Sequence, residues 1–180
     1  MNRGFWLVAL LLFLRHGLMA LINRGALPRA AHFAPMEDQE RGLYYAYQAA
    51  NVLIPLILCF LPIRVAGAAG NTGLVLVIVG ALLCARSVID FALARDGQFA
   101  SVGVYRFSRN PMYLSYNLYY LGCALLASSW MLLALVAIFV LSAHFIILAE
   151  ERWCLNTFGQ PYHEYMQRTG RYLGLRRQAG

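Results

Sequence analysis

The sequence predicts an all-α membrane protein, a polytopic bundle of about five transmembrane helices that ends in a helical hairpin and a short amphipathic tail helix. Of the 180 residues, 61% are hydrophobic and only 13% are charged, which is typical of a polytopic membrane protein. The apolar residues also gather in five stretches that can each span a bilayer at about 1.5 Å per residue. No hydrophilic segment is long enough to fold alone, so we expect a single membrane domain over residues 1–180.

The five stretches are expected to be helices in the following order: Phe5–Ile22, Leu43–Leu61, Gly73–Ala94, Met112–Ala127 and Trp130–Ala149. The first contains Arg15 and His16, but its apolar pattern continues beyond them. It is therefore expected to be an uncleaved span rather than a signal peptide. An arginine at the centre of a span costs about 2.5–3.5 kcal/mol, so Arg15 should face the bundle or a neighbouring helix.

The segments between the stretches have simple predicted roles. Pro55 is expected to kink the second helix, and the small residues of Gly67–Gly73 are expected to form a loop. Ser128 and Ser129 leave room only for a tight turn, so the last two spans should form an antiparallel hairpin. Gly159 should end the fifth helix, and Pro161 suits the first turn of a new one. The tail helix then presents one face made of Tyr162, Tyr165, Met166 and Thr169.

The formal net charge of +7 comes from arginine alone, since the chain contains no lysine. The arginines flank apolar spans, which favours membrane topology and a site for an anionic group over nucleic-acid binding. Eleven arginines lie in segments on the side of the carboxyl terminus: Arg24, Arg29, Arg41, Arg95, Arg106, Arg109, Arg152, Arg168, Arg171, Arg176 and Arg177. Only Arg3 and Arg64 lie opposite. The positive-inside rule therefore predicts a cytoplasmic carboxyl terminus. The lysine-free composition suggests a GC-rich bacterial source and the bacterial inner membrane.

The cysteines and histidines do not predict a metal site or a disulfide framework. Cys59, Cys84, Cys123 and Cys154 show no C-x-x-C spacing and lie mostly in apolar runs, where cysteine behaves as a small hydrophobic residue. The four histidines are scattered. His144 is interpreted as a hydrogen-bonded core histidine. We therefore expect no metal.

Polar and aromatic residues are concentrated on both sides of the hairpin. The segment Gly103–Tyr113 precedes it, and Glu150 and Glu151 follow it, before a tail rich in tyrosine and arginine. The hairpin returns both parts to one membrane face, where they are expected to surround a shared cavity. Adjacent helical residues point about 100° apart, so one glutamate should reach this site. Glu151 is favoured because His144 lies seven residues earlier on the same face.

The order of these motifs resembles the superfamily of isoprenylcysteine carboxyl methyltransferases and phospholipid methyltransferases. There, a G-x-Y-x-x-x-R-H-P-x-Y segment precedes a helical hairpin, a Glu-Glu pair, an F-G-x-x-Y-x-x-Y motif and a further arginine. This chain matches over about residues 95–173. The resemblance implies an integral-membrane methyltransferase that uses S-adenosylmethionine, with residues 95–173 as the cofactor-binding core. By position, the cofactor pocket would be lined or braced by Tyr105, Arg109, Asn110, Pro111, Tyr113, Glu150, Glu151, Tyr162, Tyr165 and Arg171.

One position departs from the family pattern, because Asn110 replaces the histidine. Asparagine can donate and accept hydrogen bonds but cannot titrate near neutral pH, so a proton-transfer role there is in doubt. The other residue types suit the cofactor independently of the resemblance. A carboxylate suits its ammonium or ribose hydroxyls, an arginine its carboxylate, and tyrosine faces its adenine or sulfonium.

The acceptor is expected to be lipophilic or amphiphilic, with a carboxylate, thiol or amine as the reacting group. Arg171 and Glu151 are the expected catalytic residues. An arginine, Arg171 or the deeper Arg86, would position an anionic acceptor, and a carboxylate or His144 would accept the proton of an amine. Arg86 and Asp90, four residues apart, are otherwise expected to form an ion pair. Two other functions stay open: a non-catalytic membrane subunit with a decayed site, and a nicotinamide-dependent membrane reductase on a related scaffold.

Overall fold

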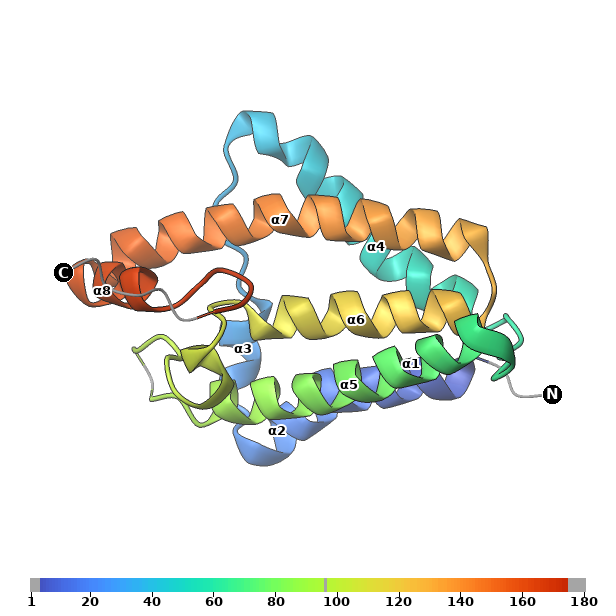
Figure 1. Ribbon diagram of the computed structural model, residues 1–180. Coiled ribbons are helices and arrows are strands. Elements are labelled where there is room, and N and C mark those ends of the chain that lie inside the picture. Colours follow the sequence, from blue (N-terminus) through green and yellow to red (C-terminus); the bar gives the residue numbers. More distant parts are fainter. Residues whose placement is uncertain (1–3, 96, 175–180) are drawn as a thin grey trace.

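The computed structural model describes residues 4–95 and 97–174, and no β-strand occurs among them (Figure 1). The first stretch forms one continuous helical run in which a π-helical segment interrupts the α-helix. The elements are α1 (Phe5–Leu12), the π-helical η1 (Phe13–Gly17), α2 (Leu18–Ile22), α3 (Ala26–Ala31), η2 (Asp38–Glu40), α4 (Arg41–Leu58), α5 (Gly67–Ala92), η3 (Gly103–Arg106), α6 (Pro111–Leu126), α7 (Trp130–Phe158) and α8 (Gln160–Arg168).

The all-α membrane class is confirmed, whereas the count of five spans is not. Within the described residues, three helical runs are long and apolar enough to cross a membrane: Phe5–Ile22, Gly67–Ala92 and Trp130–Phe158. The other two predicted stretches also form helices, but α6 has only 16 residues, and α4 carries several polar side chains. In the bundle, α6 lies between α5 and α7, and α4 packs against α7 (Figure 1).

Glycines bring the backbones of α5 and α6 into direct contact. A Cβ atom added to Gly80 would lie 2.7 Å from the backbone nitrogen of Tyr119, and one added to Gly122 would lie 2.6 Å from the carbonyl oxygen of Gly73. Small residues at helix contacts allow this close approach inside a membrane. The prediction of a loop at Gly67–Gly73 was therefore wrong. These residues form the first turns of α5. Gly73 packs against the backbone of α6 and Gly70 against the backbone of Arg64 and Val65, so both serve close packing rather than a turn.

Aromatic side chains fill the space between α4, α6 and α7. Tyr47 on α4 stacks on Phe139 of α7 with the ring centroids 5.2 Å apart, and Tyr120 of α6 meets the same ring edge-on at 5.2 Å. Tyr119 donates a 2.8 Å hydrogen bond to the carbonyl of Leu7 on α1. Ring packing and buried hydrogen bonds thus connect helices for which lipid provides little hydrophobic driving force.

The hairpin forms as predicted, and its second helix ends where Gly159 predicts. Ser129 caps α7 by accepting a 3.3 Å hydrogen bond from the amide of Leu132. The helix continues nine residues beyond Ala149, the end of the apolar stretch, and stops before Gly159, whose φ of +59° suits glycine. Both glutamates therefore lie within α7. The short α8 follows directly and has Pro161 in its first turn, as predicted.

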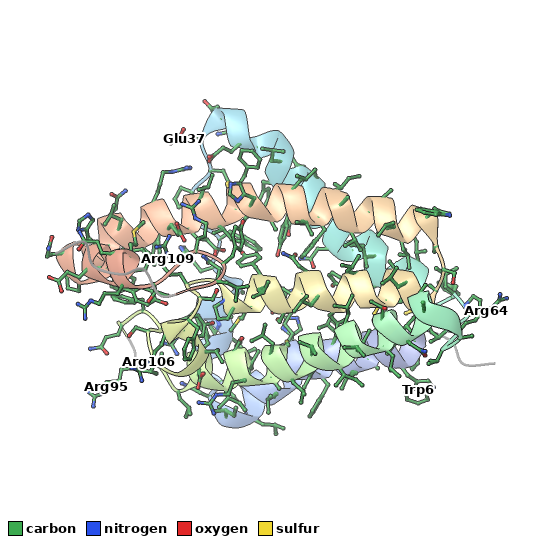
Figure 2. The ribbon with its side chains drawn as sticks, in the orientation of Figure 1. Trp6, Glu37, Arg64, Arg95, Arg106 and Arg109 are labelled. Carbon is green, nitrogen blue, oxygen red and sulfur yellow. The ribbon has the colours of Figure 1, made fainter. Side chains whose placement is uncertain are left out.

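The ends of the bundle carry different numbers of arginines. Figure 2 places Arg95, Arg106 and Arg109 near the end formed by α8, and Arg64 at the opposite end. Arg3, Arg176 and Arg177, which the charge analysis also used, lie outside the described residues. A cytoplasmic carboxyl terminus stays a prediction.

Candidate functional site

The segment Gly103–Tyr113 is anchored to the end of α5 through Asp90. Its carboxylate accepts a 2.8 Å hydrogen bond from the amide of Val104 and pairs with Arg86, with Nη2–Oδ1 at 2.8 Å. The predicted Arg86–Asp90 pair is therefore confirmed, with an additional partner. Gly103 has a φ of +60°, and a Cβ atom there would overlap the Asp90 carboxylate. The first glycine of the motif is thus required by both its backbone conformation and its neighbour.

Arg109 is buried and its guanidinium is fully engaged. Its side chain is 3% exposed. It forms a two-pronged contact with Glu151, with Nε–Oε1 and Nη2–Oε2 both at 3.0 Å. The remaining nitrogen donates to the carbonyls of Met166 and Thr169 at 3.0 and 2.9 Å. This fork geometry is the strongest form of arginine–carboxylate pairing. Arg109 therefore joins α7 to the end of α8.

Glu151 is the centre of the site. Besides Arg109, it accepts hydrogen bonds from Asn110 Nδ2 at 3.0 Å and from Arg171 Nε at 2.9 Å. The amide of Asn110 also donates to the carbonyl of Arg171 at 3.3 Å. These four residues, Arg109, Asn110, Glu151 and Arg171, are called the Glu151 cluster below. The structure confirms that Glu151 points toward the motif and that residues before and after the hairpin meet there.

Backbone contacts hold the tail against the motif. The amide of Arg109 donates to the carbonyl of Gly170 at 3.0 Å, and the amide of Gly174 donates to the carbonyl of Phe107 at 3.0 Å. The hydroxyl of Ser108 also reaches the carbonyl of Arg171 at 3.3 Å. The tail therefore runs alongside the motif, which explains how Arg171 comes to lie beside Glu151.

Tyr113 and Glu150 form a second, separate contact. The hydroxyl of Tyr113 donates a 2.7 Å hydrogen bond to Glu150 Oε1. The two glutamates thus take different partners, as the angle between neighbouring helical residues requires. Pro111 is buried at the first position of α6. Its fixed φ suits that position.

The three remaining tyrosines form an aromatic layer beside the cluster. Tyr105, Tyr162 and Tyr165 are buried, and the Tyr165 hydroxyl donates to the carbonyl of Tyr105 at 2.6 Å. Phe99 packs between them, with its centroid 5.0 Å from Tyr162 and 5.3 Å from Tyr165. Burial raises the pKa of all three phenols, so they are neutral over the ordinary pH range.

Sequence reasoning missed several residues of this region. Phe99 lies before the Gly103–Tyr113 motif, and its distance along the sequence from the motif gave no reason to include it in the site. Tyr172 stacks on His144 at 6.0 Å between ring centroids, and its hydroxyl hydrogen-bonds His144 Nδ1. The only feature of the sequence that could have indicated Tyr172 as part of the site is its position directly after Arg171. The predicted hydrogen bond of His144 is confirmed, but its side chain is only half-buried rather than in the core.

Comparison with known families agrees with this geometry. The model of the phospholipid methyltransferase family matches residues 68–161, just over half of the chain. The matched region contains the Gly103–Tyr113 motif, the hairpin and both glutamates. No curated protein and no solved structure matches the chain. The family match and the helices long enough to span a bilayer lead to one conclusion: the chain belongs to the phospholipid methyltransferase family and is an integral-membrane methyltransferase.

Proposed function

We propose that this protein transfers a methyl group from S-adenosylmethionine to a lipophilic or membrane-associated acceptor, and that the cofactor binds beside the Glu151 cluster. The observation that carries the proposal is the convergence on Glu151. Two arginines and Asn110, contributed by segments on both sides of the hairpin, donate to this one carboxylate. An enzyme that joins a charged cofactor to an apolar acceptor needs such a charged site next to membrane helices.

Hydrogen-bonding capacity separates the residues that would hold the cofactor from those that would support them. Glu151 accepts four bonds and Arg109 donates four, so these two residues would support the site without touching the cofactor. Arg171 uses only Nε among the described residues, and its side chain is 34% exposed. Its terminal nitrogens would bind the cofactor carboxylate.

Glu150 would supply the opposite charge. Its Oε1 accepts from Tyr113, whereas Oε2 has no hydrogen-bond partner among residues 4–95 and 97–174. This oxygen would accept from the ammonium or the ribose hydroxyls of the cofactor. The residues present therefore fit an amino-acid zwitterion, with Arg171 and Glu150 as its two contacts. Pro111 would fix the start of α6, and the aromatic layer of Tyr105, Tyr162 and Tyr165 would seal one side.

S-adenosylmethionine supplies a methyl group on a sulfonium cation, which an acceptor lone pair can displace in line. The protein would hold the two reactants in this geometry and exclude water, which otherwise competes with the acceptor. A carboxylate or thiolate acceptor would need no base. An amine acceptor would lose a proton, which the second carboxylate oxygen of Glu150 would accept.

The replacement of the family histidine does not favour a decayed site. Asn110 donates from one amide nitrogen to Glu151 and to the carbonyl of Arg171. It therefore supports the cluster and the tail together. The role proposed for this position is structural, and that role needs no titrating group.

Binding of radiolabelled S-adenosylmethionine to detergent-purified protein tests the proposal. Arg171→Gln and Glu150→Gln should each weaken binding about tenfold or more, since each removes a hydrogen bond to a charged group. Arg168→Gln is the matched control, because Arg168 lies in the same tail and, among the described residues, forms an ion pair only with the exposed Glu164. Absence of binding to the wild type would refute the proposed function. Unchanged affinity in both site variants would refute the assignment of the contacts.

A further inference from the structure

Arg15 lies in the membrane-spanning part of the bundle and has no carboxylate partner in the part of the chain that the structure describes. It is near the middle of the first run, Phe5–Ile22. The neighbouring helices α1, α4 and α6 contain no aspartate or glutamate, and Arg15 forms no ion pair within the described part of the chain. Charged residues at this depth are costly and usually serve a function.

The groups around the Arg15 guanidinium are polar or aromatic but neutral. Nη1 lies 3.5 Å from Asn51 Oδ1, at the limit of a hydrogen bond, and Cζ lies 5.1 Å from the centre of the Tyr116 ring. The phenols of Tyr47 and Tyr120 are within electrostatic range. These contacts stabilise a cation only partly, because none of them carries a negative charge.

The backbone around Arg15 is also unusual. Residues Phe13–Gly17 form a π-helical segment within an otherwise α-helical run, and such segments occur frequently at functional sites. On the facing helix, Pro55 has no amide hydrogen, so the carbonyl of Asn51 lacks its normal helical donor. Both helices are therefore irregular at the level where Arg15 and Asn51 meet.

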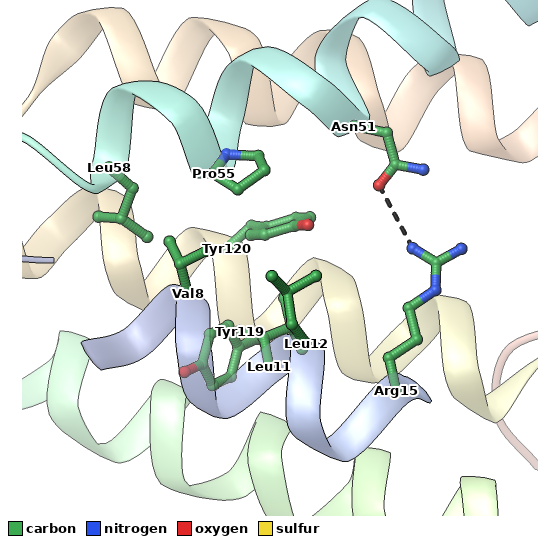
Figure 3. A pocket seen from close by; sticks show the side chains of 9 residues that line it. All are labelled: Val8, Leu11, Leu12, Arg15, Asn51, Pro55, Leu58, Tyr119 and Tyr120. Atoms are coloured by element: carbon green, nitrogen blue, oxygen red, sulfur yellow. Dashed lines mark hydrogen bonds between the residues drawn. The ribbon is translucent and has the colours of Figure 1, made fainter. Parts of the chain in front are cut away.

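Arg15 and Asn51 close one end of a cavity of about 40 Å³ between α1, α4 and α6 (Figure 3). Val8 and Leu58 lie toward the other end. Leu12 also lines the cavity and is 51% exposed, so one wall of the cavity lies at the outer surface of α1. Leu53 and Leu56 on α4 are exposed too. In a bilayer these surfaces face lipid chains, so an amphiphile can approach from the side.

We infer that Arg15 and Asn51 form a binding site for the carboxylate of an amphiphilic acceptor, whose hydrocarbon part lies in the lipid beside α1 and α4. This inference rests on the proposed function. A planar carboxylate matches the fork of a guanidinium, and it would supply the missing negative charge.

Two tyrosines connect this site to the methyl-donor region. The rings of Tyr47 and Tyr113 are 6.3 Å apart, and Tyr113 donates to Glu150. Tyr47 is within electrostatic range of both Arg15 and Glu150. Tyr47, Tyr113 and Glu150 thus lead from Arg15 to the proposed cofactor site. An acceptor bound at Arg15 would extend along these residues toward the methyl donor. Arg15 is assigned here to acceptor binding rather than to the chemical step.

Binding of oleate, oleyl alcohol and dioleoyl phosphatidate to the full-length protein in neutral detergent tests the inference. Arg15→Gln should weaken oleate binding about tenfold or more and leave oleyl alcohol unchanged. Arg15→Lys should fall between wild type and Arg15→Gln, because lysine keeps the charge but loses the fork. Arg41→Gln is the control for loss of one charge, since Arg41 is an exposed arginine that pairs with Asp38.

Equal oleate affinity in the wild type and Arg15→Gln would overturn the inference. It would also be overturned if only the binding of phosphatidate, and not that of oleate, depended on Arg15. If Arg15→Gln does not fold, Asn51→Leu provides a second test. It keeps the charge of Arg15, removes the other polar group of the proposed site, and should weaken oleate binding several-fold. S-adenosylmethionine affinity is measured on every variant and should not change. Absence of S-adenosylmethionine binding to the wild type would refute the proposed function. Oleate binding that depends on Arg15 is measured separately, so the two proposals can fail independently of each other.

Discussion

Replacing Glu151 by glutamine should destabilise the protein more than any other single change at the site. The side chain is 5% exposed and accepts four hydrogen bonds, three of them from arginines. Glutamine removes the charge and turns one acceptor oxygen into a donor, which then faces arginine donors. Arg109, only 3% exposed, would be left as a buried cation. Removal of one partner from a buried ion pair costs about 3–5 kcal/mol.

Chemical unfolding in mixed micelles, followed by tryptophan fluorescence, measures this loss. Glu164→Gln provides the control, because Glu164 pairs with Arg168 on the surface, with side chains 48% and 60% exposed. An exposed pair contributes about 0–1 kcal/mol. The double variant Glu151→Gln, Arg109→Gln should lose less stability than the sum of the single variants. A loss below about 1 kcal/mol for Glu151→Gln would show that the cluster does not hold the tail in place.

Three further variants test the packing, the tail and the family departure. Gly122→Leu should cost about 1–3 kcal/mol in the same unfolding assay, because the new side chain meets backbone atoms of α5, whereas Gly42→Ala, with open space around it, should be neutral. Tyr165→Phe removes the hydrogen bond to Tyr105 and should raise hydrogen exchange over residues 160–174. Since burial raises the pKa of the Tyr165 phenol, its contribution is complete below about pH 10 and is lost only as the pH rises further; loss near neutral pH would contradict this. Asn110→His should keep cofactor affinity within about threefold and Asn110→Leu should lower it about tenfold, because only histidine retains a donor for the cluster; equal affinities, measured by calorimetry, would argue against that donor role.

Much of the site was predictable because its residues are fixed by local rules. Adjacent positions on a helix diverge by about 100°, which separates Glu150 from Glu151. The two serines between α6 and α7 leave room only for a tight turn, so the two helices are antiparallel. Glu151 near the end of α7 therefore lies close to Arg109 just before α6. These relations depend on helix geometry and turn length, both of which the sequence contains.

The remaining features depend on tertiary contacts. The residues from Gly67 to Gly73 resemble a loop by composition, and only the closeness of α6 makes Gly73 a helix-packing residue. The saturation of Arg109 depends on the path of the tail, which places two backbone carbonyls beside its third nitrogen. Sequence spacing does not specify that path. Arg109 was expected to line or brace the proposed cofactor pocket, and its contacts favour the second of these roles.

The unbroken length of α7 has a consequence for how the two substrates would arrive. Its 29 residues extend about 43 Å, whereas the hydrocarbon layer is only about 30 Å thick. The helix must therefore extend beyond the hydrocarbon layer on at least one side. Both glutamates lie in its final turns. A water-soluble methyl donor and an oil-soluble acceptor could then meet at the boundary of the two phases, and neither would need to enter the solvent of the other.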